Sequence, residues 1–520
     1  MSTKKHLIKS TTIISLSTVL SRILGFIRIM IIARFLGTGM LADAFFAGFG
    51  IPNMLRRLMG EGSLSAGLVP VFTESLEKNT KEDTNLLMSS FLWLVLITSI
   101  LIAIIVIIFA PFLVRIIVPG FISSPEKLEL TIKITRWLVP YLIFVGVSSC
   151  TIGMLHSYKH FFIPAISSAV FNLGFIISSL YLGIIFNQPL KGIIIGVLLG
   201  GFMQVLIQWP MLVNLGFKIK FVLWHQSIKR ILKIIGPAIF ALAVMEINIA
   251  ITKIFASSES LAGKGAISIL FYANRLLELP MGIFAVAIST AILPTLSSQF
   301  IEGDIEKVKL TIVNAFRYSL FIVIPATVGL IVLRVPIIRL LFERGAFGPN
   351  ATHDTALALV FYSLGILGYV GVKIIIPVFY SLKDTFTPAK IALLILVISV
   401  LMDFILVRFM KFSGLALSIS ISNFIQFGLL IIFLKNKIGP LGLKKIFMPF
   451  IKVVMISFVM GTICYMLINF MEKNLVLNLI NQIFEVGVCI AASVIIFVVL
   501  SYIFKLKEME IISEIISKKR

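Results

Sequence analysis

The chain alternates long apolar runs with short polar segments. Residues 91–114, 391–407 and 486–504 are three of these runs. Each reaches the roughly 17–25 apolar residues that a helix needs to cross about 30 Å of hydrocarbon. A membrane β-barrel would instead alternate apolar and polar residues along strands of about ten residues. Because polar residues interrupt these runs only singly, the pattern predicts an all-α polytopic membrane protein and excludes a barrel.

We predict about fourteen transmembrane helices, which begin near residues 10, 41, 86, 131, 163, 191, 230, 266, 308, 354, 389, 413, 446 and 479. With an even number of spans, both termini lie on the same side of the membrane. The loops on that side are rich in lysine and arginine, whereas loops 257–263 and 347–355 on the opposite side contain neither. Because basic loops stay in the cytoplasm, we expect both termini to be cytoplasmic.

An internal repeat divides most of the chain into two halves. Residues 157–165 and 381–389 match at five of nine positions, at an offset of 224 residues. The same offset relates Arg115 to Arg339 in similar apolar surroundings. Helices 1–6 and 7–12 are therefore predicted to be two copies of one six-helix unit, with helices 13 and 14 appended.

The repeat sets the predicted domain boundaries. Residues 1–218 form the N-lobe with helices 1–6, residues 219–437 form the C-lobe with helices 7–12, and residues 438–520 form helices 13 and 14 with a basic tail. Because six is an even number, both copies insert in the same orientation. Parallel repeats of this kind place a central cavity between two lobes.

The composition is that of a membrane protein, and this changes how the net charge is interpreted. Of the 520 residues, 59% are hydrophobic and 13% are charged, and the net charge is +23. In a soluble protein this excess would suggest nucleic acid, but here most basic residues flank apolar segments, as topology requires. We expect no nucleic-acid partner. The cysteines lie in apolar segments, the histidines are scattered, and no Walker A motif occurs, so we expect a transporter without cofactors rather than an enzyme.

Arginines inside the apolar segments are the main clue to function. The first span carries Arg22 and Arg28, of which Arg28 is the better candidate to face a cavity. The second span carries Arg57 and Glu61, which are i,i+4 neighbours after a proline. A charge inside a span costs about 2.5–3.5 kcal/mol on insertion scales, so such a residue usually faces a cavity and has a function.

The eighth span repeats this pattern. Arg275 and Glu278 are i,i+3 neighbours, and Pro280 interrupts the helix just after them. Polar helices broken by proline at corresponding positions of two repeats indicate a transport site. Because the guanidinium fork binds phosphate through two hydrogen bonds, an arginine-lined cavity favours a phosphorylated anion.

Two further positions are open to more than one interpretation. Lys373 could add a point charge to the cavity or could form an interior pair. Asp403, with Ser399 one turn before it, offers oxygen ligands for a small cation, although one carboxylate is a weak signal.

Several motifs resemble those of the MurJ/MviN family of lipid II flippases. They are the segments at 21–28, 42–45, 52–62, 119–121, 272–280 and 342–347. The resemblance covers almost the whole chain. It implies the fold of the multidrug/oligosaccharidyl-lipid/polysaccharide (MOP) exporter superfamily and a flippase of the bacterial cytoplasmic membrane that carries lipid II for peptidoglycan synthesis.

The resemblance also implies which residues bind the substrate. The positions that match are Arg28, Asp43, Arg56, Arg57, Glu61, Arg275 and Glu278. Helices 13 and 14 would form the groove that shelters the lipid tail, and the protein would act as a monomer among membrane lipids.

The chain departs from the family pattern at three positions. Ile29 and Asn274 stand where the family commonly has aspartates, which makes the predicted cavity more positive. Thr252 stands where family members with a sodium site have a carboxylate, so a cation site would rest on Asp403, Ser399 and Thr252. Coupling to Na⁺, to H⁺ or to the membrane potential therefore stays open.

The predicted mechanism is alternating access, with the diphosphate and sugars in the basic cavity. The alternatives are an exporter of another lipid-linked saccharide or of drugs, and a membrane enzyme acting on prenyl phosphates. A drug exporter would favour carboxylates in its cavity, and a prenyl phosphate enzyme would need an acidic metal-binding cluster that the sequence lacks.

Overall fold

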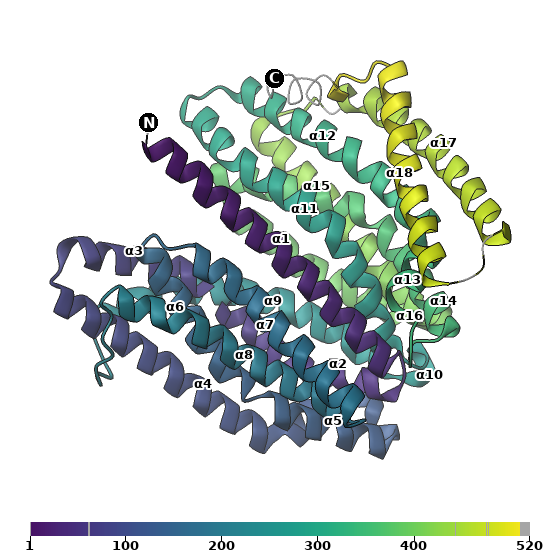
Figure 1. Cartoon of the computed structure of the whole chain (residues 1–520). Coiled ribbons are helices and arrows are strands. Elements are labelled where there is room, and N and C mark those ends of the chain that lie inside the picture. The colour runs from purple at the N-terminus through teal and green to yellow at the C-terminus, as the bar shows by residue number, and fades with distance from the viewer. Residues whose placement is uncertain (1, 61–62, 443, 475, 477, 510–520) are drawn as a thin grey trace. The chain divides into compact units, whose positions relative to one another are not determined.

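The computed structural model describes residues 2–60, 63–442, 444–474, 476 and 478–509, and this part of the chain is helical and contains no strand (Figure 1). It divides into two compact units. The first comprises residues up to Glu259 together with Lys264–Ser268 and Arg344–Phe347, and the second comprises the rest.

The first unit contains nine α-helices and two short helical turns. They are α1 (Ser2–Leu36), α2 (Met40–Gly60), α3 (Ser63–Lys78), α4 (Lys81–Ile117), the 3-10 turn η1 (Pro119–Ser123), α5 (Pro125–Leu138), α6 (Tyr141–Ser157), α7 (Phe162–Leu180), the π-helical turn η2 (Tyr181–Ile185), α8 (Pro189–Asn214) and α9 (Ile228–Ser257).

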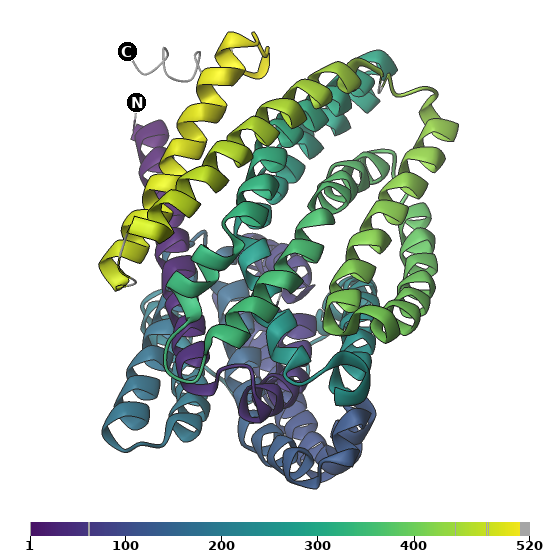
Figure 2. The same ribbon diagram turned by 90° about the vertical axis from the view of Figure 1, so that its right-hand side faces the viewer.

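The remaining helices belong wholly or mainly to the second unit. They are α10 (Glu259–Ala262), α11 (Ala266–Ile301), α12 (Ile305–Val332), α13 (Arg334–Phe342), α14 (Pro349–Leu364), α15 (Ile366–Ser381), α16 (Phe386–Ile438), α17 (Lys444–Asn474) and α18 (Leu479–Ile503). The last two lie side by side and contact each other (Figure 2).

Helix α9 packs on α2, α3 and α4, so by contacts it belongs to the first unit. The lobes predicted at 1–218 and 219–437 rest on the sequence repeat, not on contacts. They stay a prediction.

The described residues contain nine helices that are long and apolar enough to cross a membrane, or eleven when two bent helix pairs are each taken as one span. The all-helical membrane architecture is confirmed, but the count of fourteen is not. One reason is α16, which is counted as one span although the non-helical backbone of Lys411 (φ 52°, ψ −139°) divides its 53 residues into two segments, as the helices predicted to begin near residues 389 and 413 require. A second reason is that α2 contains too many charged residues to be counted among the candidate membrane spans.

The backbone supports the internal repeat. Lys159 and Lys383 both have positive φ, 62° and 59°, and Asn187 and Lys411 both have φ 52°. Each pair is separated by the offset of 224 residues found in the sequence. A non-glycine residue rarely adopts this conformation, so its recurrence at two matched positions indicates two copies of one helical unit.

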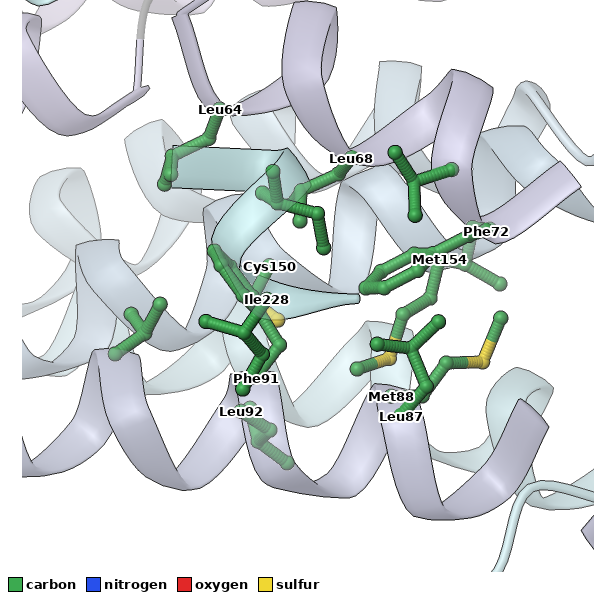
Figure 3. Close-up of a cluster of buried hydrophobic side chains, with 14 of the residues drawn as sticks. Leu64, Leu68, Phe72, Leu87, Met88, Phe91, Leu92, Cys150, Met154 and Ile228 are labelled. Atoms are coloured by element: carbon green, nitrogen blue, oxygen red, sulfur yellow. The ribbon is translucent and has the colours of Figure 1, made fainter. Parts of the chain in front are cut away.

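A buried apolar cluster holds α3, α4, α6 and α9 together in the first unit (Figure 3). Leu68, Phe72, Phe91, Met154 and Ile228 belong to it, and each is at most 2% exposed. By contrast, α4 also presents large apolar side chains outward along its length, as a helix does when it faces lipid. The cluster fixes the α3–α4–α6 bundle against which α2 and α9 are placed.

Candidate anion-binding site

Helix α2 positions most of the predicted charged residues, and two glycines set its distance from its neighbours. A Cβ on Gly48 would lie 3.1 Å from the carbonyl oxygen of Thr131 in α5. A Cβ on Gly50 would lie 2.4 Å from the Nζ atom of Lys253 in α9. Only glycine allows both approaches without displacing a neighbour, so α2 lies close to α5 and to the ammonium group on α9.

Arg28 of α1 lies against aromatic rings of α7. Its Cζ atom is 5.3 Å from the ring centre of Phe171 and 5.7 Å from that of Phe175. Cation–π contacts of this kind stabilise a guanidinium where water is scarce.

Arg56 of α2, like Arg28, lies near Tyr141 of α6. Its Nε atom donates a hydrogen bond to the side-chain oxygen of Asn53 at 2.9 Å, which orients the guanidinium along the helix. Arg56 and Arg28 both lie within electrostatic range of the buried Tyr141, whose ring packs on Phe171. The two arginines are therefore brought together around one tyrosine.

Arg57, the next residue, points to α9. Its Nε atom lies 2.8 Å from the carboxylate of Glu246, and the two side chains are 27% and 8% exposed. Lys253 lies two turns further along α9, within electrostatic range of both partners. This group contains two cations and one carboxylate.

The first unit therefore contains two sets of cations: Arg28 and Arg56 lie within electrostatic range of Tyr141, and Arg57 contacts Glu246 with Lys253 nearby. A region of excess positive charge in a membrane protein attracts an anion, and guanidinium groups select phosphate oxygens. The arrangement can hold a phosphate or diphosphate.

The second unit contains a smaller group on α11. Arg275 contacts the carboxylate of Glu278 at 2.5 Å, and the amide of Asn274 donates to the same carboxylate at 3.2 Å. The Nζ atom of Lys373 on α15 lies 5.3 Å from the ring centre of Tyr369, one turn earlier. Here the arginine has its own carboxylate, and the predicted i,i+3 pair forms.

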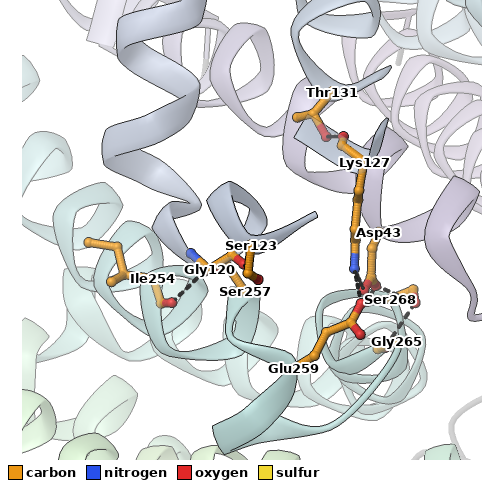
Figure 4. A network of polar contacts seen from close by, with 10 residues as sticks. All are labelled: Asp43, Gly120, Ser123, Lys127, Thr131, Ile254, Ser257, Glu259, Gly265 and Ser268. Atoms are coloured by element: carbon orange, nitrogen blue, oxygen red, sulfur yellow. Dashed lines mark hydrogen bonds and ion pairs between the residues drawn. The ribbon is translucent and has the colours of Figure 1, made fainter. Parts of the chain in front are cut away.

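Asp43 lies in a separate buried network at the other end of α2 (Figure 4). One carboxylate oxygen is 2.9 Å from the Nζ atom of Lys127, and the other accepts hydrogen bonds from the backbone N–H and the hydroxyl of Ser268. Lys127 also contacts Glu259 at 3.0 Å and lies 4.2 Å from the ring centre of Phe121. Every oxygen of Asp43 is occupied, so the structure gives this residue a packing role, and its predicted part in substrate binding stays untested.

One predicted residue lies apart from these groups, and another lies outside the described residues. Arg22 is exposed on α1. Glu61 lies outside the described residues, so the predicted pair with Arg57 is not observed, and Glu246 is the carboxylate that contacts Arg57.

The predicted cation site stays a prediction. Asp403 and Ser399 are both buried on α16, and the Ser418 hydroxyl donates to the Ser399 carbonyl oxygen at 3.3 Å. Thr252 belongs to the first unit and Asp403 to the second. Among the described residues no group of three histidine, cysteine, aspartate or glutamate side chains could hold a metal.

Three residues of the arginine group are absent from the sequence-based predictions: Tyr141, Glu246 and Lys253. A usable signal existed for two of them. Glu246 and Lys253 are seven residues apart in an apolar segment, which places both charges on one face of a helix.

Comparison with known proteins gives one consistent answer. The family described as "Lipid II flippase MurJ" matches residues 32–484. A probable lipid II flippase MurJ of Buchnera aphidicola is 36% identical over 427 residues, which cover 82% of this chain and 83% of that protein. A lipid II flippase MurJ of Burkholderia cenocepacia is 30% identical over 438 residues, which cover 83% of this chain and 84% of that protein.

Solved structures agree with these relatives. A lipid II flippase MurJ in an inward closed conformation matches with a TM-score of 0.77 and 26% identity, over 94% of this chain and 98% of that one. An inward-facing multidrug MATE transporter of the MOP superfamily matches with a TM-score of 0.67 and 17% identity, over 82% of this chain and 94% of that one. The second match concerns the fold alone.

Proposed function

The chain belongs to the MurJ family of lipid II flippases, and on that premise we propose that it moves lipid II from the cytoplasmic to the outer leaflet by alternating access. Lipid II carries a peptidoglycan precursor on an undecaprenyl chain through a diphosphate. The protein is a multi-pass transporter of the bacterial cytoplasmic membrane. In the proposed reaction no covalent bond is made or broken.

The observation that carries the proposal is that α1, α2 and α9 of the first unit bring the cations Arg28, Arg56, Arg57 and Lys253 into the apolar segments around Tyr141 and Glu246. Arg28, Arg56 and Arg57 would bind the diphosphate, because phosphate oxygens accept paired hydrogen bonds from guanidinium groups. That Arg275 and Lys373 of the second unit also contact the head group stays a prediction. The prenyl chain would remain in lipid beside α17 and α18.

The proposal includes orientation and assembly. Both termini would be cytoplasmic, because the basic segments near the termini and in loops 218–233 and 435–445 would then lie inside. The transporter would act as a monomer, since one chain contains both repeats.

Three energy sources are considered for transport: the membrane potential, a Na⁺ gradient and a H⁺ gradient. Moving one charge through the membrane field is worth about 2.3 kcal/mol per 100 mV, so the cationic group could couple transport to the potential. Coupling to Na⁺ or H⁺ would instead involve Asp403 and Ser399, with Thr252. Vesicles with a set potential, with and without a sodium or pH gradient, separate these three sources.

The test of the function is transport of fluorescent lipid II in proteoliposomes of the purified protein. We expect lipid II to be moved across the bilayer, and we expect a different saccharide on the same undecaprenyl diphosphate to be moved much more slowly. Faster transport of the other saccharide would favour the alternative, an exporter of another lipid-linked sugar. Rescue of cells depleted of their own flippase provides a second readout.

A further inference from the structure

Helices α2 and α9 run antiparallel where they meet, and two contacts between them involve charged residues of α9. Gly50 of α2 faces the ammonium of Lys253, and Arg57 of α2 contacts Glu246. On each helix the two positions are seven residues apart, so each pair lies on one helical face, about 10 Å apart along the axis. The described part of this α2–α9 contact therefore contains two cations, Arg57 and Lys253, and the carboxylate of Glu246.

Glu246 is held by only one of these cations. Its carboxylate lies 2.8 Å from the Nε atom of Arg57. Lys253 lies within electrostatic range of Glu246, yet among the described residues it has no ion pair within 4.0 Å. Lys253 is partly buried in an apolar helix, where an ammonium without a close counter-charge is unfavourable.

Binding of a diphosphate to Arg57 would change this balance. A phosphate oxygen would take the place of the Glu246 carboxylate at the guanidinium. Glu246 is 8% exposed, so it would then be a nearly buried carboxylate beside an anion, which costs free energy unless it finds a cation. Lys253 is the cation on the same face of the same helix.

We propose that Glu246 is a built-in competitor for the anionic head group, which occupies Arg57 in the empty protein and transfers to Lys253 when the diphosphate binds. The proposal rests on the proposed function, because it requires a diphosphate at Arg57. Glu246 and Lys253 are positioning residues: they set how tightly Arg57 holds the head group and how readily Arg57 releases it. A transporter needs that release, because a head group bound too tightly does not leave on the other side.

The experiment is a double-mutant cycle on binding of fluorescent lipid II to the purified full-length protein in nanodiscs. Without its competitor, Glu246→Gln binds lipid II about fivefold more tightly and flips it more slowly. Lys253→Gln binds about fivefold more weakly, because the displaced carboxylate then has no partner. These changes correspond to about 1 kcal/mol, as expected for a partly exposed ion pair.

The double variant distinguishes transfer from direct contact. If Lys253 acts only through Glu246, Glu246→Gln/Lys253→Gln binds as tightly as Glu246→Gln. If Lys253→Gln weakens binding equally in both backgrounds, Lys253 contacts the head group itself and the proposal is wrong. Lys253→Arg, which keeps the charge, restores wild-type binding.

A second variant tests the same contact without removing a charge. A Cβ on Gly50 would meet the Lys253 ammonium at 2.4 Å, so Gly50→Ala displaces it and weakens binding in the direction of Lys253→Gln. The matched control is Glu74→Gln, which removes a carboxylate from an exposed ion pair with Arg230 in the same unit and leaves binding unchanged.

The outcomes separate this inference from the proposed function. If the wild-type protein binds no lipid II, the proposed function is wrong. If the wild type binds lipid II and Glu246→Gln binds it equally well, the function stands and the transfer of Glu246 is wrong.

Discussion

Helix α2 carries two ion networks, one near each end, and they differ in how completely the charges are satisfied. At the first end, Asp43 and Lys127 are each 2% exposed and each has several partners. At the other end, Arg57 is 27% exposed, its partner Glu246 is 8% exposed, and Lys253 lies within electrostatic range of both. The same helix therefore holds one closed network, which is buried, and one network that is partly exposed.

The difference teaches how to separate structural charges from binding charges. A buried pair whose lone pairs and protons are all used has no capacity left for a ligand, and breaking it is costly. Partly exposed cations that outnumber their carboxylates keep hydrogen-bond donors for an anion. On this reasoning we expect Asp43 to stabilise α2 and the residues around Arg57 to bind substrate.

The largest expected effect is the loss of the closed network. Lys127→Met leaves Asp43 and Glu259 without their shared cation, and we expect about 3–5 kcal/mol of lost stability because one partner of a buried pair is removed. Thermal unfolding of the purified protein measures this loss. Asp43→Asn/Lys127→Met should recover part of it, and an unfolding temperature of Lys127→Met equal to wild type would contradict the assignment.

The next largest effect is expected from Arg28 of the candidate anion-binding site. Arg28→Gln removes a guanidinium that packs on Phe171 and Phe175 without disturbing the closed network. We expect lipid II binding to fall by about tenfold or more, since a hydrogen bond to a charged group is worth about 1.5–3 kcal/mol. The unfolding temperature should stay close to wild type. Arg28→Lys, which keeps the charge and loses the fork, should be intermediate, and a large drop in stability would place Arg28 with the structural charges.

A smaller effect is expected on α11. Glu278→Gln frees Arg275 from a pair whose side chains are 47% and 37% exposed. If Arg275 contacts the head group, lipid II binding becomes tighter, by at most about fivefold for an exposed pair. Binding identical to wild type would remove Arg275 from the set of substrate residues.

The smallest effect is expected on the exposed face of α3. Hydrogen bonds from Lys78 and Arg230 lower the pKa of Glu74, so this contact persists at neutral pH and is lost only as the pH falls through the acidic range. Glu74→Gln should leave the unfolding temperature at pH 7 and lipid II transport unchanged. A measurable loss of transport would show that exposed charges outside both networks also matter.

Much of the fold could be predicted from the sequence, because apolar length and the 224-residue repeat are local properties. The repeat reappears in the backbone at Lys159 and Lys383. The break at Lys411 inside α16 agrees with the two helices predicted to begin near residues 389 and 413, whereas the span count of fourteen is not confirmed.

The candidate site could be predicted only in part. Arg28 and Arg57 could be proposed because arginine is rare in apolar segments, and their part in substrate binding stays a prediction. The partner of Arg57 was not found, because Glu246 reaches it across a helix contact that joins residues distant in the sequence. Lys127, the partner of Asp43, was missed for the same reason.

The most direct test of the central claim is the rate at which proteoliposomes of Arg28→Gln/Arg57→Gln flip fluorescent lipid II. We predict a rate at the level of protein-free vesicles, with the protein still folded by its unfolding transition and with Glu74→Gln flipping at the wild-type rate. Transport by the double variant at the wild-type rate would contradict the claim that this group of arginines binds the substrate.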